Sequence, residues 1–158
     1  MAWTVRDARP EDAPTVVALI HRLTIEEGDP PGPLTVEDFL ILGFGASPRF
    51  RTLVAEAGGG VLGYALFFPS YDTDHGAKGA YLQDLYVLPE ARGRGIGRAL
   101  MSAVARACRD DGGCYLFWNA LTSNHAGRAF YHRIGAREEP VVTLSLQPDA
   151  LRRLADGP

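Results

Sequence analysis

Residues 92–98 read RGRGIGR, and this run of alternating glycines constrains the fold more than any other feature of the chain. It follows the strand-like stretch YLQDLYVLPEA and opens into ALMSAVARACR, where apolar residues recur at helical spacing at Ile96, Leu100, Val104 and Cys108. Without side chains, the backbone N–H groups of the turn point outward, beside the positive end of the next helix dipole. The pattern predicts a strand, a phosphate-binding turn and a helix.

The same turn has a second interpretation, which is a tight connection with solvated arginines. Two other phosphate-binding patterns do not match it. A P-loop requires Gly-Lys-Ser/Thr, and a dinucleotide fingerprint has the spacing Gly-x-Gly-x-x-Gly. Arg92, Arg94 and Arg98 surround the turn and could pair with phosphate oxygens.

Composition limits the class of protein. A chain of 158 residues with 46% hydrophobic residues predicts a single domain over residues 1–158. A net charge of −3 with scattered Lys and Arg argues against a nucleic-acid partner. The charged N-terminal stretch and the lack of an apolar run of about 20 residues predict a cytoplasmic protein without membrane contact. Cys108 and Cys114 read as reduced packing residues, and no metal site is expected.

The first half of the chain predicts a strand at WTVRDAR, a helix after Pro10, and a short helix capped by Thr35 and Asp38. RTLVAEA and VLGYALFFPSY read as a hairpin, DTDHGAKG as a loop, and residues 80–87 as a long strand.

The second half predicts a buried strand at CYLFWNA and a helix that Asn124 caps and Gly135 ends. VVTLSL reads as a last strand and PDALRRLA as a closing helix. The order of elements predicts a mixed α/β or α+β sheet with helices on both faces.

Two stretches carry a family resemblance. LYVLPEARGRGIGRALM resembles the acetyl-coenzyme A motif of the GNAT N-acetyltransferase superfamily, and SNHAGRAFYHRIGA is similar to its second signature. Within the superfamily, GFGASPRFRTLVAE, YLQDLYV and AFYHRIGA resemble the spermidine/spermine (diamine) acetyltransferase group. The resemblance spans nearly the whole chain. It implies the GNAT fold, with a mixed, mostly antiparallel sheet of six to seven strands.

The resemblance also implies a site for acetyl-CoA. The strand edge at Leu85, Tyr86 and Val87 would bond the pantetheine arm. The turn would hold the pyrophosphate through Arg92, Gly93, Arg94, Gly95, Ile96, Gly97 and Arg98. Asn124 matches a residue that meets the cofactor, although a helix cap is an equally good explanation, and Gly127 would leave room for the cofactor.

The resemblance assigns the role of general acid to Tyr131, whose hydroxyl would protonate the coenzyme A thiolate. A tyrosine on a half-buried helix face with its hydroxyl in water is the alternative. The proton acceptor departs from the pattern of the group, because Gln83 stands where the group commonly has Glu, and an amide can only orient water. Asp84 could replace it only if the strand bulges there, since neighbours on a regular strand point to opposite faces.

Glu26, Glu27, Asp72 and Asp74 are other candidates for the proton acceptor, although exposed acids in loops are usually only solvated. Polar side chains in and near loops are also candidates for binding the amine. The candidates are Glu26, Glu27, Asp72 and Asn119. The expected function is acetyl transfer from acetyl-CoA to a primary amine of a small molecule, in a homodimer of the kind that related enzymes form. A non-catalytic acyl-CoA sensor and a protein lysine or N-terminal acetyltransferase stay open as alternatives.

Overall fold

The computed structural model describes residues 2–74 and 76–157, which form two compact units, residues 1–120 and 121–158. We describe each unit by itself, and the expected single domain over residues 1–158 remains a prediction. None of the described helices has the length and the apolar run that crossing a bilayer would require.

The first unit is built on a five-stranded sheet in which the strands follow one another in chain order. Its strands are β1 (Thr4–Asp7), β2 (Arg51–Ala57), β3 (Gly60–Asp72), β4 (Ala77–Val87) and β5 (Tyr115–Phe117). The first four pair antiparallel, and β5 pairs parallel to β4. The mixed, mostly antiparallel sheet is confirmed. The described residues form five strands, however, and not the six to seven that were expected.

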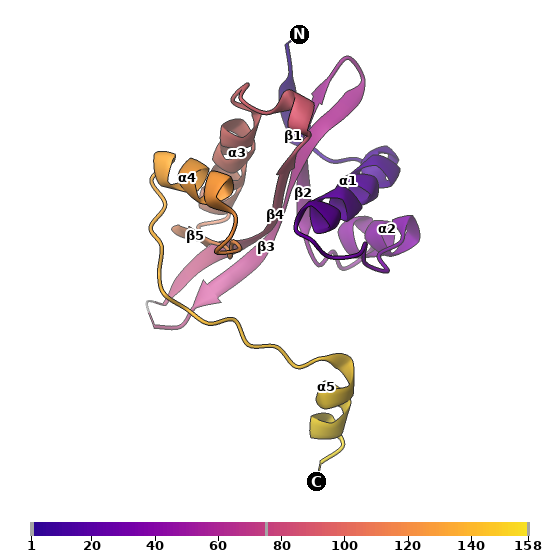
Figure 1. Ribbon diagram of the computed structural model, residues 1–158, viewed down its shortest axis with the longest axis vertical. Helices are drawn as coiled ribbons and strands as arrows, with labels where there is room; N and C mark the ends of the chain where they lie inside the picture. The colour runs from indigo at the N-terminus through magenta and orange to yellow at the C-terminus, as the bar shows by residue number, and fades with distance from the viewer. Residues whose placement is uncertain (1, 75, 158) are drawn as a thin grey trace. The chain divides into compact units, whose positions relative to one another are not determined.

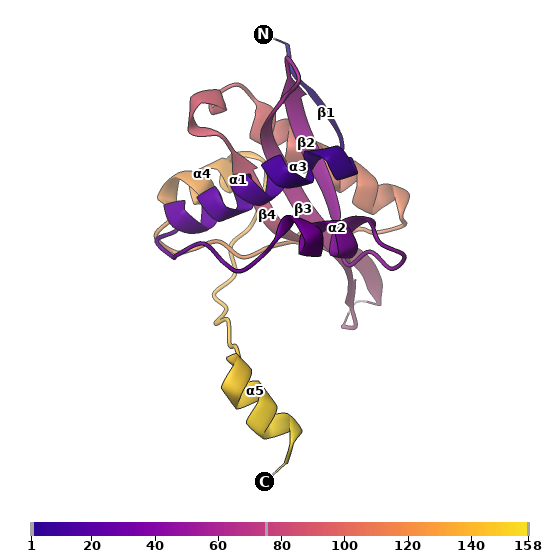
Figure 2. The same ribbon diagram turned by 90° about the vertical axis from the view of Figure 1, so that its right-hand side faces the viewer.

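Helices cover both faces of this sheet. Two helices, α1 (Ala13–Glu26) and α2 (Val36–Phe44), lie on one face, and α3 (Ile96–Asp110) lies on the other (Figure 1, Figure 2). The first face has a core of buried side chains that includes Val16, Phe39, Val54, Tyr64 and Tyr86. On α3 the predicted stripe of Ile96, Leu100, Val104 and Cys108 is buried, because these positions share one side of a helix with 3.6 residues per turn.

Short signals in the sequence fix the beginnings of these elements. Thr35 caps α2 as predicted: its hydroxyl accepts from the Asp38 N–H at 3.0 Å, and the Asp38 carboxylate accepts from the Thr35 N–H at 3.2 Å. Pro10 starts a short 3₁₀ turn, Pro10–Asp12, directly before α1. A second 3₁₀ turn, Pro89–Ala91, follows β4 and leads to the glycine turn.

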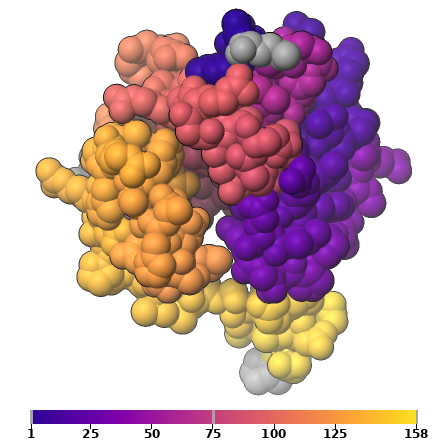
Figure 3. Space-filling model, turned by 45° about the horizontal axis from the view of Figure 1, so that its top comes forward, coloured from indigo at the N-terminus to yellow at the C-terminus, as the bar shows by residue number. Residues whose placement is uncertain are grey.

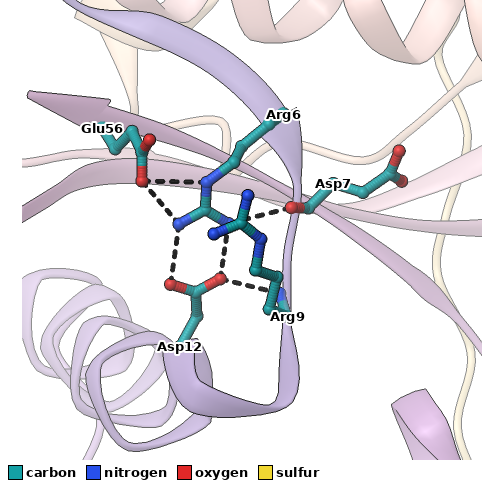
Figure 4. Close-up of polar contacts among 5 residues, drawn as sticks. All are labelled: Arg6, Asp7, Arg9, Asp12 and Glu56. Atoms are coloured by element: carbon teal, nitrogen blue, oxygen red, sulfur yellow. Dashed lines mark hydrogen bonds and ion pairs between the residues drawn. The ribbon is translucent and has the colours of Figure 1, made fainter. Parts of the chain in front are cut away.

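A charged cluster fastens the start of α1 to the sheet (Figure 4). The Arg6 guanidinium on β1 donates to Asp12 Oδ2 at 2.6 Å and to Glu56 Oε2 on β2 at 2.5 Å. The hydrogen bond from Arg6 keeps the pKa of Asp12 below its usual range. Because Arg6 is only one-fifth exposed, water screens these charges less than at an open surface. The cluster therefore ties the residue directly before α1 to β1 and β2.

Three sequence predictions were wrong. Residues 77–79 belong to β4 and not to the expected DTDHGAKG loop, in which His75 lies outside the described residues. The expected buried strand CYLFWNA forms only the three residues of β5, and Phe117 is 45% exposed. VVTLSL forms no strand in the described part of the second unit. An alternating pattern favours a strand, but a strand also needs a neighbour for its N–H and C=O groups.

The second unit contains two helices, α4 (His125–Arg133) and α5 (Pro148–Ala155). Asn124 caps α4 as predicted, since its side chain accepts from the Gly127 N–H at 2.9 Å. Gly135 follows the helix with φ +97°, a left-handed conformation that commonly ends helices. Arg128 then binds Glu138 through two nitrogens, each at 2.7 Å, which fixes the chain after α4.

Candidate active site

The glycine turn presents unbonded backbone donors at the start of α3. Gly93 and Gly95 have φ of +75° and +81°, which side-chain-bearing residues adopt only with strain. Gly95 is the N-cap of α3 and carries no side chain that could bond the helix start. The first N–H groups of a helix have no partner within the helix. The amides from Ile96 onward can therefore donate to an anion at the positive end of the helix.

Arg92 is tied to the neighbouring strand. Its Nε donates to the Val87 carbonyl at 2.8 Å, and its Nη2 donates to Glu26 Oε2 at 2.7 Å. The guanidinium also lies 5.5 Å from the ring centre of Tyr86. In the space-filling view the salmon segment around residue 90 lies directly against the violet end of α1 (Figure 3). Arg92 thus joins the turn, β4 and α1.

Glu26, expected to bind the amine, already has partners of its own. Besides Arg92, it accepts from the Tyr86 hydroxyl at 2.5 Å. Burial acts to raise the pKa of Glu26, but the hydrogen bonds from Tyr86 and Arg92 leave that pKa below its ordinary value. The acid therefore stays ionised in a bridge between α1 and β4.

The outer edge of β4 is open along the residues that were expected to hold pantetheine. On one side β4 pairs with β3 as far as Val87, but on the other side it pairs with β5 only from Gly79 to Tyr81. Within the described first unit, the stretch that includes Leu85, Tyr86 and Val87 therefore has no strand on that side. Such an edge offers N–H and C=O groups to an extended ligand. It leads directly through the second 3₁₀ turn to the glycine turn.

The bulge required for Asp84 to replace Gln83 is present. Phe67 pairs with Leu82 and the preceding Leu66 pairs with Asp84, so Gln83 is the extra residue on β4. An extra residue reverses the alternation of side chains between the two faces. Asp84 consequently shares its face with Tyr64 and with the core under α1 and α2, whereas Gln83 is exposed.

Asp84 is a half-buried acid whose pKa is raised. The Tyr64 hydroxyl donates to Asp84 Oδ2 at 3.2 Å. Burial, with a smaller contribution from the charge of Glu27, raises the pKa of Asp84 to about 6, and the Tyr64 hydrogen bond opposes this rise. Burial and the charge of Asp29 also raise the pKa of Glu27. No cation of the described residues contributes to the pKa of either acid, although the charge of Glu27 acts on Asp84.

Two other predicted residues lie elsewhere in the first unit. Asp72 is six residues beyond Leu66 along β3, roughly 20 Å at the rise of a strand, so it is not brought to Asp84. Its carboxylate accepts from the Asp74 N–H at 2.9 Å in the hairpin loop. Asn119 is exposed and follows β5.

Arg98 lies in a shallow groove beside the glycine turn. Trp3 contributes to this groove, and its ring would lie 3.9 Å from a Cβ placed on Gly95. The remaining wall is formed by β1 and by one side of α3, where Ser102 and Arg106 stand one and two turns after Arg98.

The candidate residues of the second unit are on α4. Gly127 has a structural role there, because a Cβ on it would lie 2.6 Å from the Asn124 amide and would disturb the cap. Tyr131 is partly buried and its ring centre is 5.2 Å from that of Phe130. Asn124 is thus a helix cap, and this role does not conflict with an additional contact to a cofactor.

Sequence reasoning missed Tyr64 and Trp3. Tyr64 is hidden in the apolar run VLGYALFF and reads as a core residue, which it also is, with no exposed surface. Nothing in the sequence shows that it faces Asp84, because that depends on the register of β3 against β4. The described residues contain no group of His, Cys, Asp and Glu that could hold a metal ion.

These features define a class of fold, a mixed sheet with an open strand edge that leads to a glycine turn at the start of a helix. Residues 17–136 match the Acetyltransferase (GNAT) family. The chain belongs to this family, and it is an acyltransferase enzyme.

Named relatives agree with this placement. The chain is 32% identical to the thialysine N-epsilon-acetyltransferase of Bos taurus over 96% of both chains. It is 31% identical to the human spermidine/spermine N(1)-acetyltransferase-like protein 1, over 78% of this chain and 19% of that protein. The fold resembles that of an integron cassette protein from V. cholerae, with a TM-score of 0.82, 23% identity and 99% of both chains covered. The resemblance to GNAT and diamine acetyltransferases is confirmed.

Proposed function

We propose that the protein transfers an acetyl group from acetyl-CoA to a primary amine of a small molecule. The observation that carries this proposal is the continuity of the open β4 edge with the glycine turn. Pantetheine would form hydrogen bonds along residues 85–87. The pyrophosphate oxygens would accept hydrogen bonds from the backbone N–H groups at the start of α3. A thioester carbonyl on the same edge would be polarised by a backbone N–H.

The acids of the first unit support a cationic acceptor. Asp84 and Glu27 lie near enough for the charge of Glu27 to raise the pKa of Asp84. An ammonium group would relieve this repulsion. The names of the relatives point the same way, because thialysine Nε and spermidine/spermine N1 are both amine nitrogens. A chain without such acids would have no electrostatic preference for a small cation.

A thiol-release assay tests the proposal. Purified protein with acetyl-CoA would be offered polyamines, amino acids, aminoglycosides and lysine peptides. We expect release of coenzyme A with at least one small amine and little with the peptides. Turnover of the peptides alone would favour a protein acetyltransferase, and tight acetyl-CoA binding without turnover of any amine would favour a sensor.

Replacing Gly95 with Leu should prevent acetyl-CoA binding. Leu avoids the left-handed conformation that Gly95 adopts at φ +81°, so the turn would rearrange and withdraw its amides. Loss of two charge-assisted hydrogen bonds, at about 1.5–3 kcal/mol each, corresponds to about 10²-fold weaker binding in calorimetry or more. Gly112→Leu is the matched control, because Gly112 has φ +80° in the turn after α3. Equal binding by both variants would contradict the proposed phosphate site.

Tyr131→Phe should lower turnover while acetyl-CoA affinity stays the same. On the family resemblance, Tyr131 protonates the departing thiolate, and loss of a general acid costs about 10²-fold in rate or more. Steady-state kinetics and calorimetry on the same preparation separate the two effects. Tyr71→Phe, at an exposed tyrosine on β3, is the control, and an unchanged rate in Tyr131→Phe would remove Tyr131 from the mechanism.

We also propose that the protein forms a homodimer through its C-terminal segment. Apolar side chains of residues 141–146 are exposed, with Val142 at 83% and Leu144 at 88%, and such a patch is typical of an interface. Light scattering should give the mass of a dimer for the protein and of a monomer for Val142→Lys/Leu144→Lys. Ser145→Lys adds charge to the same segment and should remain a dimer. A monomeric wild-type protein at micromolar concentration would contradict the proposal.

A further inference from the structure

The bulge in β4 leaves Asp84 with one committed and one open oxygen. Oδ2 accepts from the Tyr64 hydroxyl. Oδ1 has no hydrogen-bond partner among the described residues, and it is not among the buried polar atoms that lack one, so it reaches accessible space. Tyr64 itself is fully buried and cannot turn to water. The carboxylate is therefore held by one oxygen and available through the other.

The charged groups around Asp84 leave it without a cation of its own. From β3 and from the end of α1 it faces Tyr64 and Glu27, and no basic side chain of the described residues contributes to its pKa. Tyr86 lies beside Tyr64, with 6.4 Å between ring centres, and donates to Glu26.

The nearby arginines act on Glu26 and Tyr86. Arg92 is bound to Glu26 and to the Val87 carbonyl. Burial and the hydrogen bond to Glu26 raise the pKa of Tyr86, and the charge of Arg22 opposes this rise; the same charge adds to the lowering of the pKa of Glu26. A cation that neutralises Asp84 therefore has to come from outside the described residues.

From this arrangement we infer that Asp84, and not the exposed Gln83, accepts the first proton of the substrate ammonium, and that Tyr64 is the positioning residue for its carboxylate. The inference rests on the proposed function and names the group that makes the amine nucleophilic. It follows from the extra residue at Gln83, which turns Asp84 toward the face that α1 and α2 cover, and from the hydrogen bond that leaves Oδ1 open.

The protons and bonds of the step balance. An N–H bond of the ammonium breaks and its proton binds Asp84 Oδ1, which leaves a neutral amine with a free electron pair. That pair forms the C–N bond at the thioester carbonyl. When the C–S bond breaks, the thiolate takes a proton from the general acid, a role that the family resemblance assigns to Tyr131, and the second proton of the nitrogen replaces it. Asp84 then returns its proton to water, so the products are an amide, a thiol and one released proton.

Because the acceptor must be ionised, the rate should rise with pH through the pKa of Asp84, about 6. We call this rise the acidic limb of the pH profile. We expect Asp84→Asn to lose about 10²-fold in kcat/KM and to show no acidic limb. Two further variants should move the limb in opposite directions. Tyr64→Phe removes a hydrogen bond that lowers the pKa, so the midpoint should move to higher pH. Glu27→Gln removes a charge that raises the pKa, so the midpoint should move to lower pH.

Matched variants separate this role from general damage. Tyr71→Phe should leave the midpoint and the turnover unchanged, and Gln83→Ala should keep the midpoint at the wild-type pH. If the limb survives in Asp84→Asn, or disappears in Gln83→Ala, the inference is overturned. A purely structural Tyr64 would change turnover without moving the midpoint, and this result would also overturn its positioning role.

Two readouts do not depend on activity. Carbon NMR of the carboxyl groups should show Asp84 titrating near pH 6 and shifting upward in Tyr64→Phe. Because the pKa is higher in the folded state than in the unfolded state, ionised Asp84 costs stability as pH rises from about 4 to 6. Asp84→Asn should therefore raise Tm at pH 8 and not at pH 4. If these shifts occur but no amine is acetylated, the proposed function fails; if amines are acetylated and Asp84→Asn keeps the limb, only this inference fails.

Discussion

The candidate site depends on one extra residue in a β-strand. At Gln83, β4 has one more residue than the paired stretch of β3. Each side chain of β4 after this position therefore points to the opposite face from the one it would face in a regular strand. Before the bulge, Leu82 is buried on the face that α3 covers, and after it Asp84 and Tyr86 face the helices α1 and α2. In a regular strand Asp84 would lie with Leu82. The acid reaches the side of the sheet that α1 and α2 cover only through this irregularity.

Electrostatics divides the surroundings of β4 into two parts. The glycine turn and the start of α3 supply positive potential from backbone N–H groups and the helix dipole. The end of α1 supplies the carboxylates of Glu26 and Glu27, and β4 supplies that of Asp84. Arg92 neutralises Glu26, whereas no cation of the described residues contributes to the pKa of Glu27 or of Asp84. Under the proposed function, the anionic acetyl-CoA would approach β4 from the glycine turn, and the cationic amine would approach it from the end of α1. Arg92 connects the two parts because it contacts both the strand and α1.

Remote contacts hold this arrangement in place. The Arg6 cluster fixes the start of α1 against β1 and β2, and the helix then runs fourteen residues to Glu26. A shift at its beginning would therefore move the acids at its end.

The sequence by itself determined the local structure whose causes are local. Glycines 93 and 95 specify a left-handed turn, the apolar stripe specifies the buried face of α3, and Thr35 and Asn124 specify helix starts through bonds over three residues. It also carried the family resemblance that the comparisons confirmed. It overestimated the strands, because the alternation in VVTLSL cannot supply a neighbour to pair with. Only the tertiary structure decided the register of β3 against β4, and with it the bulge, the meeting of Tyr64 with Asp84 and the pairing of Glu26 with Arg92. These contacts join residues that are 20 to 66 positions apart in the sequence. Residues so far apart come into contact only when the whole sheet and its helices pack together.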